Sequence, residues 1–159
     1  MRKIRLYLPF FCLYLAGFFG CSSPTISAPN DDEKNTSVYD AVKESGKYTS
    51  KDSVSAYICK FDKLPSNYIN KSKGQALYEE KTGNTFSKWN FNPWKTLGVM
   101  IGGDTFENRE GQLPSGSYHE ADVDYGSQTS RGTKRLIYRS GCIVYYTADH
   151  YESFKKLNF

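Results

Sequence analysis

Residues 118–125 read Tyr-His-Glu-Ala-Asp-Val-Asp-Tyr, and two short runs follow, Arg-Leu-Ile-Tyr-Arg at 135–139 and Cys-Ile-Val-Tyr-Tyr-Thr at 142–147. All three runs are rich in β-branched and aromatic residues, and turn-forming Gly, Ser and Thr separate them. This pattern predicts an antiparallel meander of strands in the C-terminal part of the chain.

The part of the chain before these runs has a helical pattern. Val54, Tyr57, Ile58 and Phe61 recur at the spacing of one helix face, and that helix must end before Pro65, whose ring cannot continue it.

A second, shorter helix is predicted by the capping box of Ser72 and Gln75, with its end near Gly83. Residues 84–98 mix Asn, Pro and Gly with Phe and Trp without a clean period, so we expect a loop there. Helices followed by strands predict an α+β domain, with the N-terminal helices packed on one face of a C-terminal antiparallel β-sheet.

The N-terminus has the order of an export signal. Three basic residues among the first five precede an apolar run over residues 6–19, and Gly-Cys-Ser-Ser follows at 20–23. The run is shorter than a membrane span requires, so we expect residues 1–20 to be a removable signal peptide. Cys21 resembles the lipidated N-terminal cysteine of bacterial lipoproteins; ordinary cleavage nearby is the alternative.

Composition divides the remainder into two parts. Residues 22–48 are rich in Ser, Thr, Pro, Asn and Asp, which predicts a flexible tether, and residues 49–159 are expected to form one domain. A charged fraction of 24% excludes a polytopic membrane protein, and 16% aromatic residues exclude wholesale disorder. Fifteen basic and twelve acidic side chains give residues 49–159 a net charge of +3, which alone does not indicate a nucleic-acid binder.

Candidate acid–base groups lie in and after the predicted strands. The chain has two histidines, His119 and His150, and alternation places His119 on the opposite face of its strand from Glu120. An imidazole that works beside Glu120 must therefore be His150.

Charge is segregated along the sequence. Residues 104–124 carry six acidic side chains and one basic one, whereas residues 126–159 carry six basic and two acidic ones. If these segments are neighbours, a carboxylate, arginines and a histidine converge, which suits chemistry at a phosphodiester.

Several motifs in one order resemble the barnase branch of the microbial guanyl-specific ribonucleases, from about Val54 to the C-terminus. These motifs are KLPSNYINKS at 63–72, IGGD at 101–104, FENREG at 106–111, EAD at 120–122, RLIY at 135–138 and DHY at 149–151. The resemblance implies the microbial ribonuclease fold. The chain departs from the family pattern in its longer segment 84–98 and in one extra residue between Glu120 and Arg131.

The resemblance also implies an endoribonuclease that cleaves single-stranded RNA, preferentially after guanine, without a metal or other cofactor. The 2′-hydroxyl of the substrate attacks the neighbouring phosphorus, and the resulting 2′,3′-cyclic phosphate is then hydrolysed. Glu120 matches the base of the family and His150 its acid. Lys71, Arg131 and Arg135 match the cations that stabilise charge on the phosphate oxygens. On the residues alone, the two arginines could instead pair with the acidic strand.

The guanine-binding residues are implied in the same way. The segment Glu107-Asn108-Arg109-Glu110 matches the guanine reader, in which Glu110 would accept hydrogen bonds from the base. The aromatic rings of Phe106 and Tyr151 would stack on the base.

Two cysteines, Cys59 and Cys142, replace family residues of other types at positions that adjoin in the family fold. The resemblance therefore implies a disulfide between them in an exported protein. A barnase-like enzyme is further expected to be a monomer with an acidic inhibitor protein as a partner. The N-terminal signal and Cys21 predict a secreted or extracytoplasmic location, with a lipid anchor as the only membrane contact. The alternative from another class is a catalytically inactive RNA- or protein-binding module, against which the presence of Glu120 and His150 argues.

Overall fold

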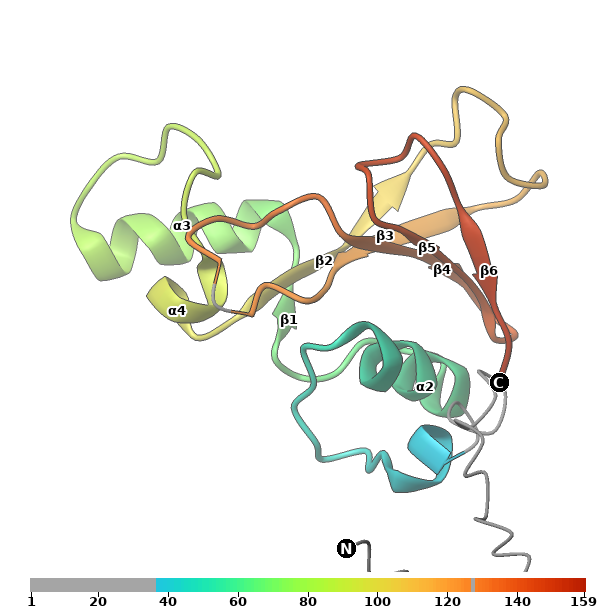
Figure 1. The fold of residues 1–159 in the computed structure, drawn as a ribbon. Helices are drawn as coiled ribbons and strands as arrows, with labels where there is room; N and C mark the ends of the chain where they lie inside the picture. Colours follow the sequence, from blue (N-terminus) through green and yellow to red (C-terminus); the bar gives the residue numbers. More distant parts are fainter. Residues whose placement is uncertain (1–36, 127) are drawn as a thin grey trace, which may run out of the picture.

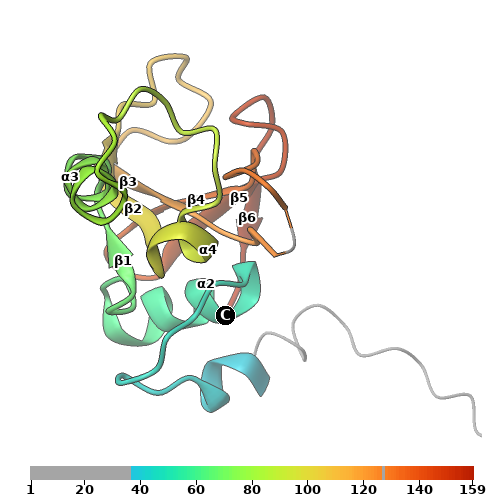
Figure 2. The same ribbon diagram turned by 90° about the vertical axis from the view of Figure 1, so that its left-hand side faces the viewer.

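The computed structural model describes residues 37–126 and 128–159 and confirms the α+β fold (Figures 1 and 2). Within these residues one six-stranded sheet has the strand order β1-β2-β3-β4-β5-β6. The elements are α2 (Lys51–Phe61), β1 (Tyr68–Ile69), α3 (Lys71–Thr82), α4 (Pro93–Leu97), β2 (Met100–Phe106), β3 (Tyr118–Asp122), β4 (Arg135–Arg139), β5 (Ile143–Thr147) and β6 (Lys155–Leu157).

The predicted meander is present as β3, β4 and β5, which pair antiparallel. The sheet also contains three strands that the sequence pattern did not predict: β1, which runs parallel to β2, then β2 itself and β6. Strand β3 ends at Asp122 instead of continuing to residue 125. The reason is local, because Asp124 adopts a left-handed conformation (φ 57°) and its N–H donates to the carbonyl of Thr49.

Helix α2 confirms the predicted first helix. The hydroxyl of Ser50 accepts a hydrogen bond from the N–H of Ser53 at its start, and Asp62 in left-handed conformation ends it. Its apolar face packs on the sheet and forms the main core, which contains Val54, Ile58, Ala121, Val123, Leu136, Val144 and Leu157. We call the side of the sheet turned away from α2 the site face.

The second helix begins differently from the prediction. The side chain of Asn70, and not that of Ser72, caps α3 by accepting from the N–H of Lys73, while Gly83 (φ 69°) ends the helix as expected. The predicted loop 84–98 contains the short helix α4, for which Asn92 is the cap. Of the labelled helices, α2 lies beneath the sheet in Figure 1, whereas α3 and α4 pack beside its β1–β2 end.

Part of the predicted tether is folded. Val42 is buried, the hydroxyl of Tyr57 donates to the carbonyl of Glu44 at 2.8 Å, and Lys60 donates to the carbonyl of Val42 at 3.1 Å. Residues 42–44 of the predicted tether therefore contact helix α2. The predicted signal peptide, Cys21 and the rest of the tether lie outside the described residues. In the described part of the chain, no helix combines the length and apolarity that crossing a membrane requires.

A disulfide joins Cys59 on α2 to Cys142 in the turn before β5, across 83 residues of sequence, with the two Cα atoms 4.2 Å apart. It links the helix to the sheet at one end of the core.

Replacing both Cys59 and Cys142 by serine is expected to lower the free energy of unfolding by about 2–4 kcal/mol, because the cross-link restricts the unfolded chain. Urea denaturation of the oxidised wild type and the double variant measures the difference. Two free thiols in the native protein, detected by labelling before reduction, would contradict the disulfide itself.

Candidate active site

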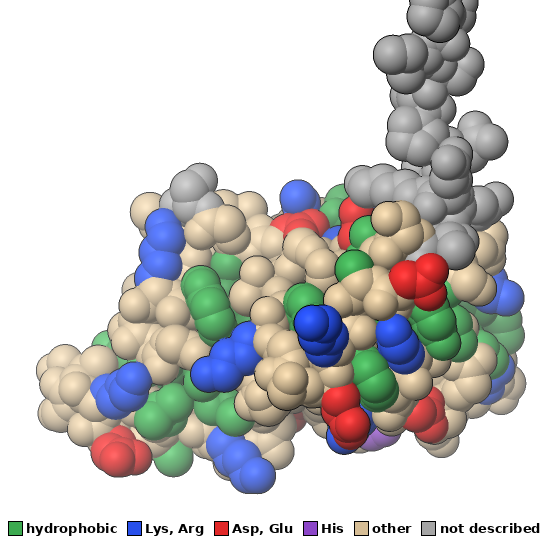
Figure 3. Space-filling view, turned by 90° about the horizontal axis from the view of Figure 1, so that it is seen from below, with side chains coloured by type: hydrophobic (Ala, Val, Ile, Leu, Met, Phe, Trp, Pro, Cys, Tyr) green, Lys and Arg blue, Asp and Glu red, His purple; other side chains and the backbone are tan. Residues whose placement is uncertain are grey.

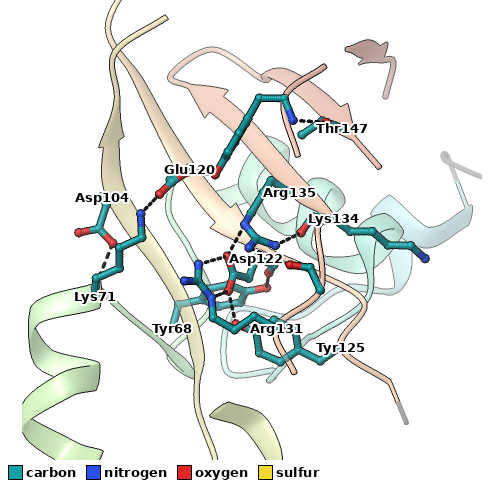
Figure 4. Close-up of polar contacts among 12 residues, drawn as sticks. Tyr68, Lys71, Asp104, Glu120, Asp122, Tyr125, Arg131, Lys134, Arg135 and Thr147 are labelled. Carbon is teal, nitrogen blue, oxygen red and sulfur yellow. Dashed lines mark hydrogen bonds and ion pairs between the residues drawn. The ribbon is translucent and has the colours of Figure 1, made fainter. Parts of the chain in front are cut away.

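Glu120 is at the centre of the site face. Its neighbour Ala121 on β3 points into the core, so Glu120 points the opposite way, as the alternation predicted. Glu120 is only 6% exposed, and its two carboxylate oxygens accept hydrogen bonds from the ammonium group of Lys71 and the hydroxyl of Tyr151. Figure 4 shows Lys71 reaching from the start of α3 towards Glu120.

The start of α3 is fixed beside Glu120 by Asp104. The N–H of Lys71 donates to Oδ2 of Asp104 at 2.9 Å, and Asp104 is the residue of β2 that pairs with Glu120 on β3. The same residue therefore contributes its side chain to the cap of α3 and its backbone to the sheet. This arrangement places the Lys71 ammonium group at the carboxylate.

Opposing effects act on the pKa of Glu120. Burial raises the pKa of this carboxyl, but hydrogen bonds from Lys71 and Tyr151 and the charges of Lys71 and Arg135 lower it, and the net result is a pKa below the ordinary value of 4.5. Burial and the bond to Glu120 raise the pKa of Tyr151, so that its hydroxyl remains a donor. Glu120 is therefore ionised at neutral pH despite its burial.

Two residues along β3, Asp122 holds both arginines of the site. Arg131 makes two hydrogen bonds to it, from Nε to Oδ2 at 2.6 Å and from Nη2 to Oδ1 at 2.8 Å. Arg135 Nε lies 2.7 Å from Oδ1 in an ion pair that lacks the alignment of a hydrogen bond. The hydroxyl of Tyr125 also donates to this carboxylate, and that of Tyr68 donates to the carbonyl of Asp122 at 2.8 Å (Figure 4).

Both arginines therefore do pair with the acidic strand, the possibility that the sequence left open. The side chains of Arg131 and Arg135 are 11% and 3% exposed, and that of Lys71 is 40% exposed. The sequence analysis did not single out Asp122 as the residue that holds them. Its place two residues from Glu120 on the same face was the available signal.

His150 is exposed on the loop between β5 and β6, beside Tyr151, with the two ring centroids 4.6 Å apart. Burial and the charges of Arg135 and Arg131 lower the pKa of His150, while Glu120 and Asp122 act in the opposite direction. The net result is a pKa of His150 below the ordinary value of 6.5. His119 lies on the other face of the sheet, beside Tyr138.

The loop that carries His150 has a left-handed backbone at two successive residues, His150 (φ 61°) and Tyr151 (φ 80°). Asp149 holds this conformation by accepting hydrogen bonds from the Thr147 hydroxyl at 2.8 Å and the Ser153 N–H at 3.0 Å. The N–H of Tyr151 donates to the Thr147 hydroxyl at 3.0 Å. Asp149 therefore organises the loop that carries His150.

The predicted guanine reader forms a tight loop next to Tyr151. Asn108 has a left-handed backbone (φ 45°), and its side-chain amide makes two hydrogen bonds to the backbone of Leu113. It accepts from the N–H at 3.1 Å and donates to the carbonyl at 2.8 Å. Glu107 and Arg109 pair with each other on the surface, and Glu110 is exposed.

An aromatic contact joins this loop to the site. The rings of Phe106 and Tyr151 lie 5.5 Å apart, and Gln112 donates to the carbonyl of Tyr151 at 3.3 Å.

Figure 3 shows the α2 side of the molecule for comparison. There the described Lys and Arg side chains are scattered among apolar and neutral ones and form no continuous basic surface in that view. The arginines that surround a buried carboxylate belong to the site face.

A surface of this kind is suited to acid–base cleavage of a phosphodiester, and the α+β fold that carries it is that of the microbial ribonucleases. The family model described as ribonuclease matches residues 51–158. The ribonuclease of Heyndrickxia coagulans is 42% identical over 109 residues, which cover 67% of this chain and 94% of that protein.

Two further relatives have narrower matches. Guanyl-specific ribonuclease St of Saccharopolyspora erythraea is 48% identical over 56 residues, covering 33% of this chain and 55% of that protein. A structure of ribonuclease Sa2 in complexes with mononucleotides is 26% identical, covers 58% of this chain and 93% of that one, and has a TM-score of 0.35. The chain belongs to the ribonuclease family, and it is a barnase-like endoribonuclease.

Replacing Asp122 by Asn is expected to lower the free energy of unfolding by about 3–5 kcal/mol, because it leaves Arg131 and Arg135 buried without their counter-charge. Urea denaturation measures the loss. Asp124→Asn is the matched control, since that side chain is more exposed and its backbone conformation suits Asn, and we expect a change below about 1 kcal/mol. Equal stability of the two variants would contradict the role of Asp122.

Proposed function

We propose that this ribonuclease cleaves single-stranded RNA preferentially after guanine, by transesterification through a 2′,3′-cyclic phosphate. The observation that carries the proposal is the buried carboxylate of Glu120, whose pKa is lowered through Lys71 and Tyr151 so that it can accept a proton near neutral pH. RNA supplies its own nucleophile, so the protein needs to provide a proton acceptor, a proton donor and positive charge. DNA has no 2′-hydroxyl and cannot react in this way.

In the first step Glu120 takes the proton of the 2′-hydroxyl while the 2′-oxygen attacks phosphorus. The bond from phosphorus to the 5′-oxygen breaks, and His150 gives that oxygen a proton. In the second step the roles reverse. His150 takes a proton from water while the water oxygen attacks phosphorus, the bond from phosphorus to the 2′-oxygen breaks, and Glu120 returns its proton to the 2′-oxygen. The exposed position of His150, with Tyr151 between it and Glu120, supports this division of roles.

Positive charge in the proposed site comes from Lys71, Arg131 and Arg135. Negative charge accumulates on the non-bridging phosphate oxygens in the transition state, and cations held in place before the reaction stabilise it. Lys71 is the most exposed of the three side chains and the most accessible to a phosphate.

Guanine preference is proposed for the loop of residues 106–111. The exposed carboxylate of Glu110 can accept from the N1 and N2 donors of guanine, and Phe106 with Tyr151 offers aromatic surface for stacking. The name of the Saccharopolyspora relative, guanyl-specific ribonuclease St, supports this preference.

We also propose that the protein is exported through the signal at residues 1–20, is anchored by lipid at Cys21, and acts as a monomer. The disulfide supports export, because such bonds persist in oxidising compartments. An acidic inhibitor protein fits the positive site as a partner. The inactive binding module is not favoured, since the proposed base and acid are both present.

Incubation of the purified protein with short RNAs in EDTA is expected to give products that end in guanosine 2′,3′-cyclic phosphate. Glu120→Gln and His150→Gln should each lower the rates of both steps about 10²- to 10⁴-fold, because each removes a group that transfers a proton in both steps. Mass spectrometry of the products and initial rates measure these outcomes.

His119→Gln is the matched control, because His119 lies on the other face of the sheet, and its rates should equal those of the wild type. Undiminished turnover by Glu120→Gln or by His150→Gln would refute the assigned roles. Product ends without a preference for guanine would refute the proposed specificity alone.

The pH profile of kcat/KM is expected to be bell-shaped. Activity needs Glu120 ionised, so the acid limb should lie below 4.5, and it needs His150 protonated, so the alkaline limb should lie below 6.5, because both pKa values are lowered from these ordinary values. Initial rates at low substrate concentration give the profile. The residual activity of His150→Gln should lack the alkaline limb, and an unchanged limb there would assign it to another group.

A further inference from the structure

The guanidinium of Arg131 is held by a second group besides Asp122. Asp122 contacts its edge through Nε and Nη2 (Figure 4), and the central carbon of the guanidinium lies 5.2 Å from the centroid of the Trp89 ring. A planar cation over an aromatic face is attracted by the ring quadrupole, most strongly for Trp. The guanidinium of Arg131 is thus hydrogen-bonded to Asp122 along one edge, and the Trp89 ring lies against one of its faces.

Trp89 is seated closely against α3. A Cβ atom at Gly74 would lie 2.8 Å from Cη2 of Trp89 and 2.7 Å from Cδ1 of Ile101, so any larger residue at this position would force one of them to shift. Glycine is a poor residue inside a helix. Its presence in α3 is explained by the close approach of the indole.

Two further rings contact the indole, and a third packs against them. The centroid of Phe86 lies 4.8 Å from that of Trp89 in an edge contact, and that of Phe91 lies at 5.6 Å. Tyr78 of α3 stacks on Phe91 at 4.8 Å. The segment predicted as an irregular loop is therefore a packed aromatic cluster, anchored on α3.

This cluster is also tied to the segment that carries Arg131. The side-chain amide of Asn92 donates to the carbonyl of Gln128, three residues before Arg131, at 3.0 Å. The aromatic segment and the β3–β4 connection are thus joined by this hydrogen bond as well as by the contact between Trp89 and Arg131.

We propose that Trp89 is a positioning residue for Arg131, holding the plane of the guanidinium in the orientation that meets the scissile phosphate. The inference rests on the proposed function, in which Arg131 stabilises charge on the phosphate oxygens. Asp122 fixes the edge of the guanidinium, and contact with the indole ring would restrict the tilt of the guanidinium plane. A cation that is already oriented stabilises the transition state without being ordered during the reaction. Trp89 therefore acts through Arg131 and does not itself touch the substrate.

A double-mutant cycle tests this role. Trp89→Leu keeps an apolar side chain but removes the aromatic face, and we expect it to lower kcat on a short guanine-containing RNA by roughly 3- to 30-fold, with little change in KM. Trp89→Phe keeps a ring and should restore part of the loss. In an Arg131→Ala background, Trp89→Leu should cause no further loss of kcat. Each variant is assayed below its measured unfolding midpoint.

Trp94→Leu is the matched control, because it removes the other tryptophan of the chain, which is 36% exposed on α4, and kcat should stay at the wild-type value. An equal loss from Trp89→Leu in both backgrounds would overturn the inference, as would an unchanged kcat. If Trp89→Leu does not fold, the loss of kcat caused by Trp89→Phe is compared between the wild-type and Arg131→Ala backgrounds instead.

The failure of the inference differs from the failure of the proposed function. If Glu120→Gln abolishes turnover while the Trp89 variants are fully active, only the positioning role is lost. If Glu120→Gln is itself fully active, the proposed mechanism is wrong. An Arg131→Ala variant with wild-type kcat overturns the positioning role, because Trp89 then has no group to act through.

Discussion

The carboxylate of Asp122, at 1% exposure, lies between two arginines at the centre of the sheet. A buried charge is tolerated only when it is paired and hydrogen-bonded, so Arg131 and Arg135 cannot move away from it without a large cost in stability. Because Glu120 stands two residues earlier on the same face, this pairing also concentrates positive charge beside the proposed base. The pairing of Asp122 with the two arginines therefore contributes both to the stability of the sheet and to the electrostatics of the site.

The state of Glu120 depends on groups from distant parts of the chain. Lys71 starts α3 and Tyr151 lies in the loop before β6, and both meet the carboxylate only when the sheet is complete. Without them, burial alone would raise the pKa of Glu120 and leave the carboxyl less acidic. Folding therefore sets the ionisation of the proposed base, which lies on a strand, whereas the proposed acid His150 lies on a loop whose conformation Asp149 fixes.

Sequence reasoning succeeded where the signal was local. Alternation along residues 118–122 separated Glu120 from His119, and the periodicity over residues 54–61 identified α2. It failed where contacts between distant segments decide the structure. Strand β2 contains two consecutive glycines and exists because its neighbours pair with it, and the cluster around Trp89 has no period because its rings pack on α3 and Arg131. The choice of Asn70 over Ser72 as a cap was a local ambiguity, since both side chains can accept from a backbone N–H.

The electrostatics of His150 connect its protonation to the substrate in the proposed mechanism. Beyond the effect of burial, the charges of Arg135 and Arg131 lower the pKa of His150, and they do so while the site carries no phosphate charge to offset them. A bound phosphodiester contributes a negative charge among the same groups, which opposes the effect of the arginines and favours the imidazolium. In the proposed mechanism the arginines therefore add to the effect of burial and disfavour the charged imidazole in the free enzyme, while a bound phosphate favours the protonated form that acts as the acid. This coupling requires the arginines to stay at Asp122, with the proposed contribution of Trp89 for Arg131, since a guanidinium that moved towards solvent would act more weakly on both the phosphate and the imidazole.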